Sequence, residues 1–139
     1  MKSITKNLVY FSIVLFITTI LFRYVLSSML QNRLFSLIWF FVIGYGVTIF
    51  IFGWIFGKRD QLTLPLYDIG FRFHLATYII CNLIAEGWYL LNLQSDYENI
   101  RSVHLTVIIW GVFLLIHYIL FLVTRKNAIK GIKRSELFE

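Results

Sequence analysis

Four long apolar runs, separated by short polar breaks, set the pattern of the chain. The runs cover residues 8–27, 34–57, 71–91 and 103–123. A hydrocarbon core about 30 Å thick needs roughly 20 apolar residues, because each helical residue rises about 1.5 Å. The pattern therefore predicts an all-α integral membrane protein built as a bundle of four transmembrane helices.

The composition favours a membrane protein over a soluble one. Of the 139 residues, 59% are hydrophobic and one is a proline. The mean hydropathy is +0.77, which is too apolar for a soluble domain of this size. The first run is longer than a signal-peptide core and no small-residue cleavage pattern follows it, so we expect it to be retained. The lipid bilayer is thus the first partner that the sequence predicts.

Lysine and arginine are distributed unevenly around the predicted spans. Cytoplasmic flanks carry the excess of these residues. With four spans, Arg33 and Arg101 fall on one side and ten others on the opposite side. Both termini are therefore predicted to be cytoplasmic, in a protein of the inner membrane. The net charge of +6 then reflects orientation, and we expect no nucleic-acid partner. The ten residues are Lys2, Lys6, Lys58, Arg59, Arg72, Arg125, Lys126, Lys130, Lys133 and Arg134.

The runs divide the chain into three parts. Residues 1–70 form an N-terminal helix pair with its cytoplasmic loop, residues 71–124 a two-helix hairpin, and residues 125–139 a basic cytoplasmic tail. The tail alternates apolar and basic residues at a spacing typical of a short amphipathic helix on an anionic leaflet.

One face of the third predicted helix is polar. His74, Tyr78, Asn82 and Glu86 recur at every fourth residue, and such residues share one sector of a helix. A charge exposed to lipid costs at least roughly 2.5–3.5 kcal/mol. We therefore expect this face to turn toward other helices or a water-filled cavity.

His74 and His117 lie at matched distances on either side of the hairpin's link. In an antiparallel hairpin they come to similar depth, so we expect the two imidazoles to face each other. They could ligate a haem iron, share a proton or link the helices by hydrogen bonds, and we favour hydrogen bonds. No cysteine or carboxylate stands at a spacing that would complete a metal site, so no metal is expected.

Arg23 and Glu86 are the two intramembrane charges of opposite sign at similar predicted depth. An ion pair between the first and third helices is the interpretation that we favour, and a proton or ion pathway is the alternative.

Glycines are placed for close helix packing in the second run. Gly46, Gly53 and Gly57 fall on one stripe, and the last two form a GxxxG motif. Such a stripe lets helix backbones approach closely in lipid. The neighbouring helix could belong to the same chain or to another copy.

The segments FHLATYIICN at 73–82 and WGVFLLIH at 110–117 resemble the two-transmembrane-helix domain family of Bacteroidota. The resemblance covers residues 71–124 and implies a hairpin in which Gly111 packs closely. Members of that family occur alone or attached to signalling domains such as histidine kinases, which implies a membrane anchor or sensor module. The matching positions are Phe73, His74, Tyr78, Asn82, Trp110, Gly111, Leu114 and His117.

No Ser-His-Asp arrangement, HExxH, Walker loop or CxxC motif is found in the chain, so no catalysis is expected. The leading hypothesis is a small membrane module that acts as an anchor, sensor or partner-binding subunit, with a second copy or another membrane protein as partner. The alternative is a homo-oligomeric pore or membrane-disrupting effector. A weaker alternative is an electron carrier that binds haem, through His74 and His117, or a quinone.

Overall fold

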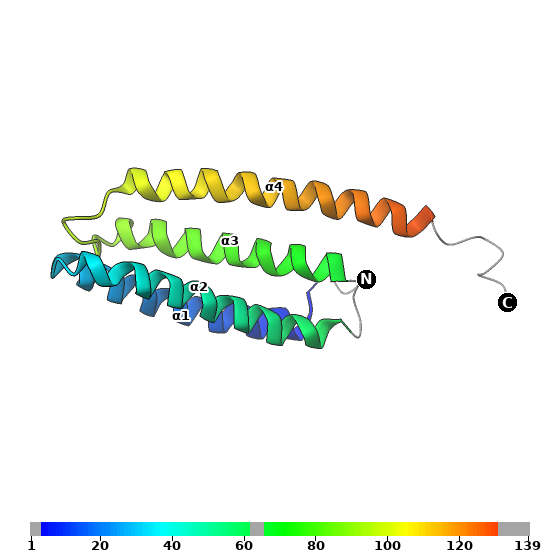
Figure 1. The fold of residues 1–139 in the computed structure, drawn as a ribbon, viewed down its shortest axis with the longest axis horizontal. Coiled ribbons are helices and arrows are strands. Elements are labelled where there is room, and N and C mark those ends of the chain that lie inside the picture. The colour runs from blue at the N-terminus through cyan, green and yellow to red at the C-terminus, as the bar shows by residue number, and fades with distance from the viewer. Residues whose placement is uncertain (1–3, 62–65, 131–139) are drawn as a thin grey trace.

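The computed structural model describes residues 4–61 and 66–130, with side chains for 4–61 and 68–124. Four helices make up the described chain (Figure 1): α1 Lys6–Gln31, α2 Phe35–Asp60, α3 Leu66–Leu90 and α4 Ile100–Lys130. The prediction of an all-helical protein with four helices is confirmed. Helix α4 continues into the segment that was expected to form a separate tail helix, and residues 131–139 of that tail lie outside the described residues.

Local hydrogen bonds define the ends of α1 and α3. The Thr5 side chain accepts a hydrogen bond from the Leu8 amide at 3.1 Å and caps α1. Helices α1 and α3 are each followed by a residue in the left-handed region, Arg33 with φ 58° and Asn92 with φ 53°. In both cases the next amide donates back to a carbonyl five residues earlier. This is the Schellman arrangement, which satisfies the last carbonyls of a helix.

Helix α3 lies at the centre of the bundle. It packs against α1, α2 and α4, whereas α4 has α3 as its only helix neighbour among the described residues. Figure 1 shows α3 between α4 and the α1–α2 pair. The buried core is small: Phe11 and Leu15 of α1 meet Ile69 and Phe73 of α3. The Phe11 and Phe73 rings lie 4.8 Å apart.

Three helices are long and apolar enough to cross a membrane: α1, α2 and the Ile100–Thr124 part of α4. Their surfaces carry large exposed side chains such as Trp39 and Phe40, 72% and 76% exposed. Lipid can solvate such side chains at no cost, whereas water cannot. Helix α3 has a similar length of 25 residues but carries the polar face described above.

The predicted glycine stripe is divided between two environments. A Cβ atom added to Gly53 would lie 3.8 Å from Phe11, and one added to Gly57 would lie 3.5 Å from Ile69, so these two glycines pack within the chain. Gly46 faces open space. Gly111 supports the α3–α4 contact, because an added Cβ would lie only 3.1 Å from the Tyr78 hydroxyl.

Candidate functional site

A chain of hydrogen bonds links α3 to α4. The structure brings His74 and His117 together, with their Nδ1 atoms 3.1 Å apart. The Trp110 indole of α4 donates from Nε1 to His74 Nε2 at 2.8 Å. One turn after His74 on α3, the Tyr78 hydroxyl donates to the Val107 carbonyl at 3.2 Å. We call these contacts the α3–α4 link.

The indole fixes the protonation of both histidines. An indole nitrogen only donates, so His74 Nε2 must accept and the His74 proton must sit on Nδ1. His74 Nδ1–H then donates to His117 Nδ1, which leaves the His117 proton on Nε2. Both rings are therefore neutral, and Trp110, His74 and His117 donate in one direction along the link.

Asn82 shares the polar face of α3 but does not join the link. Its Nδ2 donates to the Tyr78 carbonyl one turn earlier at 2.8 Å. This is its only hydrogen bond within the part of the chain that the structure describes. Asn82 is also one of the residues that line a cleft between the helices.

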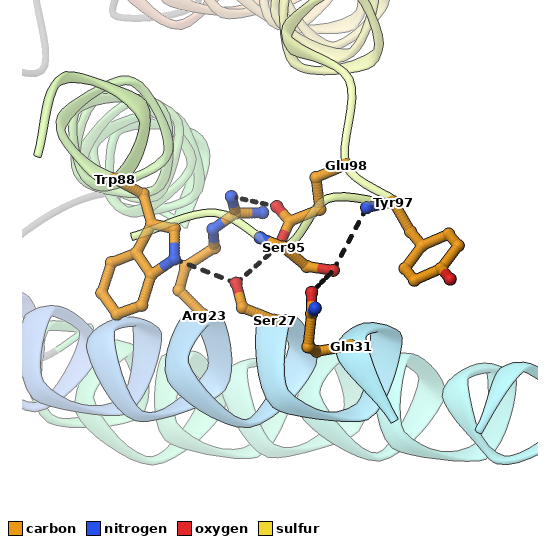
Figure 2. Close-up of polar contacts among 7 residues, drawn as sticks. All are labelled: Arg23, Ser27, Gln31, Trp88, Ser95, Tyr97 and Glu98. Carbon is orange, nitrogen blue, oxygen red and sulfur yellow. Dashed lines mark hydrogen bonds and ion pairs between the residues drawn. The ribbon is translucent and has the colours of Figure 1, made fainter. Parts of the chain in front are cut away.

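The structure does not bring Arg23 and Glu86 together, and the expected ion pair between them is wrong. Arg23 Nη2 instead lies 2.7 Å from Glu98 Oε2, with side chains 10% and 6% exposed. Glu86 Oε1 lies 3.2 Å from His104 Nε2 at a more exposed position. The physical reason is the α3–α4 connection, residues 91–99, which folds back over α1 and carries Glu98 to the depth of Arg23 (Figure 2).

Glu98 is surrounded by donors at this end of the bundle. Its Oε1 accepts from the Ser27 hydroxyl and, at 3.2 Å, from the Ser95 amide. Trp88 of α3 donates from Nε1 to the Ser27 hydroxyl at 2.9 Å. Figure 2 shows these side chains converging from α1, α3 and the connection. Hydrogen bonds to a carboxylate are roughly twice as strong as neutral ones, so these contacts fix the connection to α1. We call this group of residues the outer clamp: Arg23, Ser27, Trp88, Ser95 and Glu98.

Gln31 adds a second attachment to the outer clamp. Its Oε1 accepts from the Ser95 hydroxyl at 3.0 Å and from the Asp96 amide at 3.2 Å. The Tyr97 amide in turn donates to the Ser95 hydroxyl at 3.2 Å. The connection is therefore held at several successive residues, which positions Glu98.

Sequence reasoning missed the outer clamp, although α1 contains a signal for it. The buried positions of α1 recur at every fourth residue and become polar toward the end of the helix. A polar continuation of a buried stripe indicates polar groups to be satisfied there. The stripe consists of Phe11, Leu15, Thr19, Arg23 and Ser27.

Two clefts follow α3 between α2 and α4. One, of about 390 Å³, lies beside the outer clamp and is lined by Tyr45, Asn82 and Trp110 among others. The other, of about 500 Å³, lies at the opposite end, where His74 and His117 line it. Polar side chains of α3 therefore face spaces that α4 leaves open.

The geometry of the histidine pair suits a hydrogen bond better than a shared haem. Two histidines on one haem iron bind from opposite faces, which at roughly 2 Å per bond places their nitrogens about 4 Å apart. Here the Nδ1 atoms are 3.1 Å apart, and His74 Nε2 already accepts from Trp110. Among the described residues, no group of three or more His, Cys, Asp or Glu could hold a metal ion.

Comparison of the chain with family models, with curated proteins and with solved structures found no match. The resemblance of residues 71–124 to the two-transmembrane-helix domain family therefore stays a prediction.

Proposed function

We propose that this chain is a membrane module that crosses the inner membrane four times, with both termini in the cytoplasm. It acts without catalysis as a sensor or partner-binding subunit, and α4 carries its output. The lysine and arginine distribution supports this topology. As a span, α3 would keep most of its polar side chains among its neighbours, because it packs against α1, α2 and α4.

The observation that carries the proposal is the uneven attachment of α4. Helices α1, α2 and α3 pack against one another, whereas α4 packs on α3 alone. The outer clamp fixes the connection that leads into α4. Further along, the α3–α4 link supplies a few hydrogen bonds. Because α4 touches only α3 in the described part of the chain, breaking these hydrogen bonds would loosen the α3–α4 contact without altering the contacts among α1, α2 and α3.

The exposed surfaces favour this proposal over a pore. A pore built from several copies needs a polar exposed face, but the exposed side chains of α2 between residues 37 and 55 are aromatic and aliphatic, as Trp39, Phe50 and Trp54 illustrate. The resemblance to a hairpin found with signalling domains points in the same direction. A partner in the membrane, a second copy or another protein, would contact these apolar surfaces.

Mobility of α4 can be measured with spin labels. In a Cys81→Ser background, we expect labels at Ile55→Cys and Val123→Cys to give a broad or two-component distance distribution in nanodiscs, because α4 has one neighbour. Labels at Val9→Cys and Ile55→Cys, on the packed α1–α2 pair, should give a narrow one. All three labelled positions are exposed. Equally narrow distributions would overturn the proposal that α4 is the output element.

The topology is tested by cysteine accessibility. In intact cells that express the Cys81→Ser protein, we expect an impermeant thiol reagent to label Asp96→Cys, in the outer connection, but neither Ser3→Cys nor Ser135→Cys. Permeabilisation should expose all three. Labelling of either terminal cysteine before permeabilisation would contradict the four-span topology.

A further inference from the structure

The cleft beside the outer clamp has the size and composition of a small-molecule site. Its volume of about 390 Å³ falls within the roughly 300–1,000 Å³ of typical ligand pockets. Apolar residues of α1, among them Phe22 and Leu26, form one wall, and α4 contributes Val103 and Trp110. Such pockets combine mostly apolar walls with a few polar groups.

The charges in the cleft cancel. Its charged lining residues are Arg23 and Glu98, which lie 2.7 Å apart and are both almost fully buried. An ionic ligand would lose its hydration without meeting an uncompensated opposite charge, which is unfavourable. The cleft therefore selects for a neutral ligand.

An aromatic stack is already formed in the wall. The Phe22 and Tyr45 rings lie 3.9 Å apart at 17°, and the Phe22 and Phe41 rings 5.1 Å apart at 11°. Trp110 lines the same cleft from α4. Because aromatic rings prefer offset-stacked or edge-on neighbours, these walls suit a flat ring.

The Tyr45 hydroxyl is already engaged inside the protein. The Thr19 hydroxyl donates to the Leu15 carbonyl at 2.7 Å, so it must accept at 2.8 Å from Tyr45. The Tyr45 oxygen can then accept from the Cys81 thiol at 3.4 Å. Asn82 differs, because its carboxamide retains Oδ1 and one N–H beyond its bond to the Tyr78 carbonyl. A ligand carbonyl could accept from this N–H, and a ligand hydroxyl could donate to Oδ1.

We propose that this cleft binds a neutral amphiphile whose flat ring carries a carbonyl or hydroxyl group, the chemistry of a quinone or phenol headgroup. The ring lies among Phe22, Tyr45 and Trp110, and its polar group bonds to Asn82. The inference rests on the proposed function, because the four-span topology places the cleft in the outer half of the bilayer, where such molecules dissolve. A ligand here touches both α3 and α4 and so acts on the element proposed to carry the output.

Quenching of tryptophan fluorescence tests the site. The full chain carrying Trp39→Phe and Trp54→Phe is titrated in detergent micelles with a benzoquinone that bears a decyl tail. We expect saturable quenching at one quinone per chain, and loss of that component in the Trp110→Phe variant. Laurate, an anionic amphiphile of similar length, should not compete.

Variants separate binding in the cleft from partition into the micelle. Ala85→Phe fills the cleft and should abolish saturable quenching, and Asn82→Leu should weaken binding at least tenfold. Leu83→Ala is the matched control, because Leu83 is 67% exposed and lies outside the cleft lining. Circular dichroism checks folding, and if Ala85→Phe does not fold, Asn82→Leu decides. Non-saturable quenching, equal quenching in all variants, or displacement by laurate would overturn the proposal.

Failure of this inference can be told apart from failure of the proposed function. Absent quinone binding together with a broad Ile55–Val123 distance distribution would leave α4 as the output element and remove only the ligand. Saturable binding together with a narrow distribution would retain the site and remove the output role of α4.

Discussion

Replacing Glu98 by Gln is expected to destabilise the protein by about 3–5 kcal/mol, because Arg23 would remain as a buried charge without its counter-ion. Arg23 and Glu98 are 10% and 6% exposed, so water cannot replace the lost carboxylate. The free energy of unfolding can be measured in mixed micelles by titration with a denaturing detergent, followed by circular dichroism. The loss should appear as a lower midpoint of unfolding.

Two further variants make the Glu98 experiment specific. Glu86→Gln is the matched control, because Glu86 is 38% exposed and pairs with His104, so its loss should cost less than about 1 kcal/mol. The double variant Arg23→Met/Glu98→Gln should recover much of the stability, since no charge stays buried and the carboxamide oxygen can still accept from Ser27 and the Ser95 amide. Equal losses for Glu86→Gln and Glu98→Gln would contradict the assignment of Glu98 as the counter-ion.

The second large effect is expected for His74→Leu. This change leaves the Trp110 indole N–H and His117 Nδ1 without their partners. Each unsatisfied group costs about 1–3 kcal/mol when buried, and partial exposure places the expected total near the lower end of that range. The measurement is again unfolding in mixed micelles, combined with the width of the Ile55–Val123 distance distribution, which should increase.

Variants of the other two histidines serve as controls for the stability loss expected of His74→Leu. His117→Leu removes the partner of His74 Nδ1 alone and should cost less than His74→Leu. His104→Leu removes a side chain that is 57% exposed and should change stability little. A His74→Leu protein that is as stable as His104→Leu, with an unchanged distance distribution, would show that the α3–α4 link does not hold α4.

The helices could be predicted from the sequence because their signal is local. Each apolar run is long enough to span a bilayer, and polar breaks mark the ends. The approach of His74 to His117 could also be anticipated, since antiparallel helices joined by a short link place residues at equal distances from it side by side. Both inferences use positions counted along one continuous segment.

The partner of Arg23 could not be predicted in the same way. Counting residues along helices identified Glu86 as the carboxylate at equal depth, but Glu98 lies in a polar connection that a sequence pattern treats as solvent-exposed. Its position depends on the fold of residues 91–99 and on contacts with Ser27 and Gln31, which are over 60 residues distant in sequence. Tertiary contacts of this kind leave no periodic signal.

The neighbours of the glycine stripe could not be predicted either. The spacing of Gly46, Gly53 and Gly57 predicts one face, but spacing along one helix does not say which neighbouring side chains lie opposite each position. Gly53 and Gly57 meet α1 and α3 side chains, whereas Gly46 meets none.

The length of α4 has a mechanical consequence. Its 31 residues rise about 46 Å at 1.5 Å per residue, so a tilt of about 5° at the clamped end would displace the far end by about 4 Å. When a ligand or partner shifts the first turns of α4 by a fraction of an ångström, the displacement at Lys130 is several times larger. In the role proposed for α4, the buried carboxylate network around Glu98 is the fixed point of this movement, and its stiffness sets how far the Lys130 end is displaced.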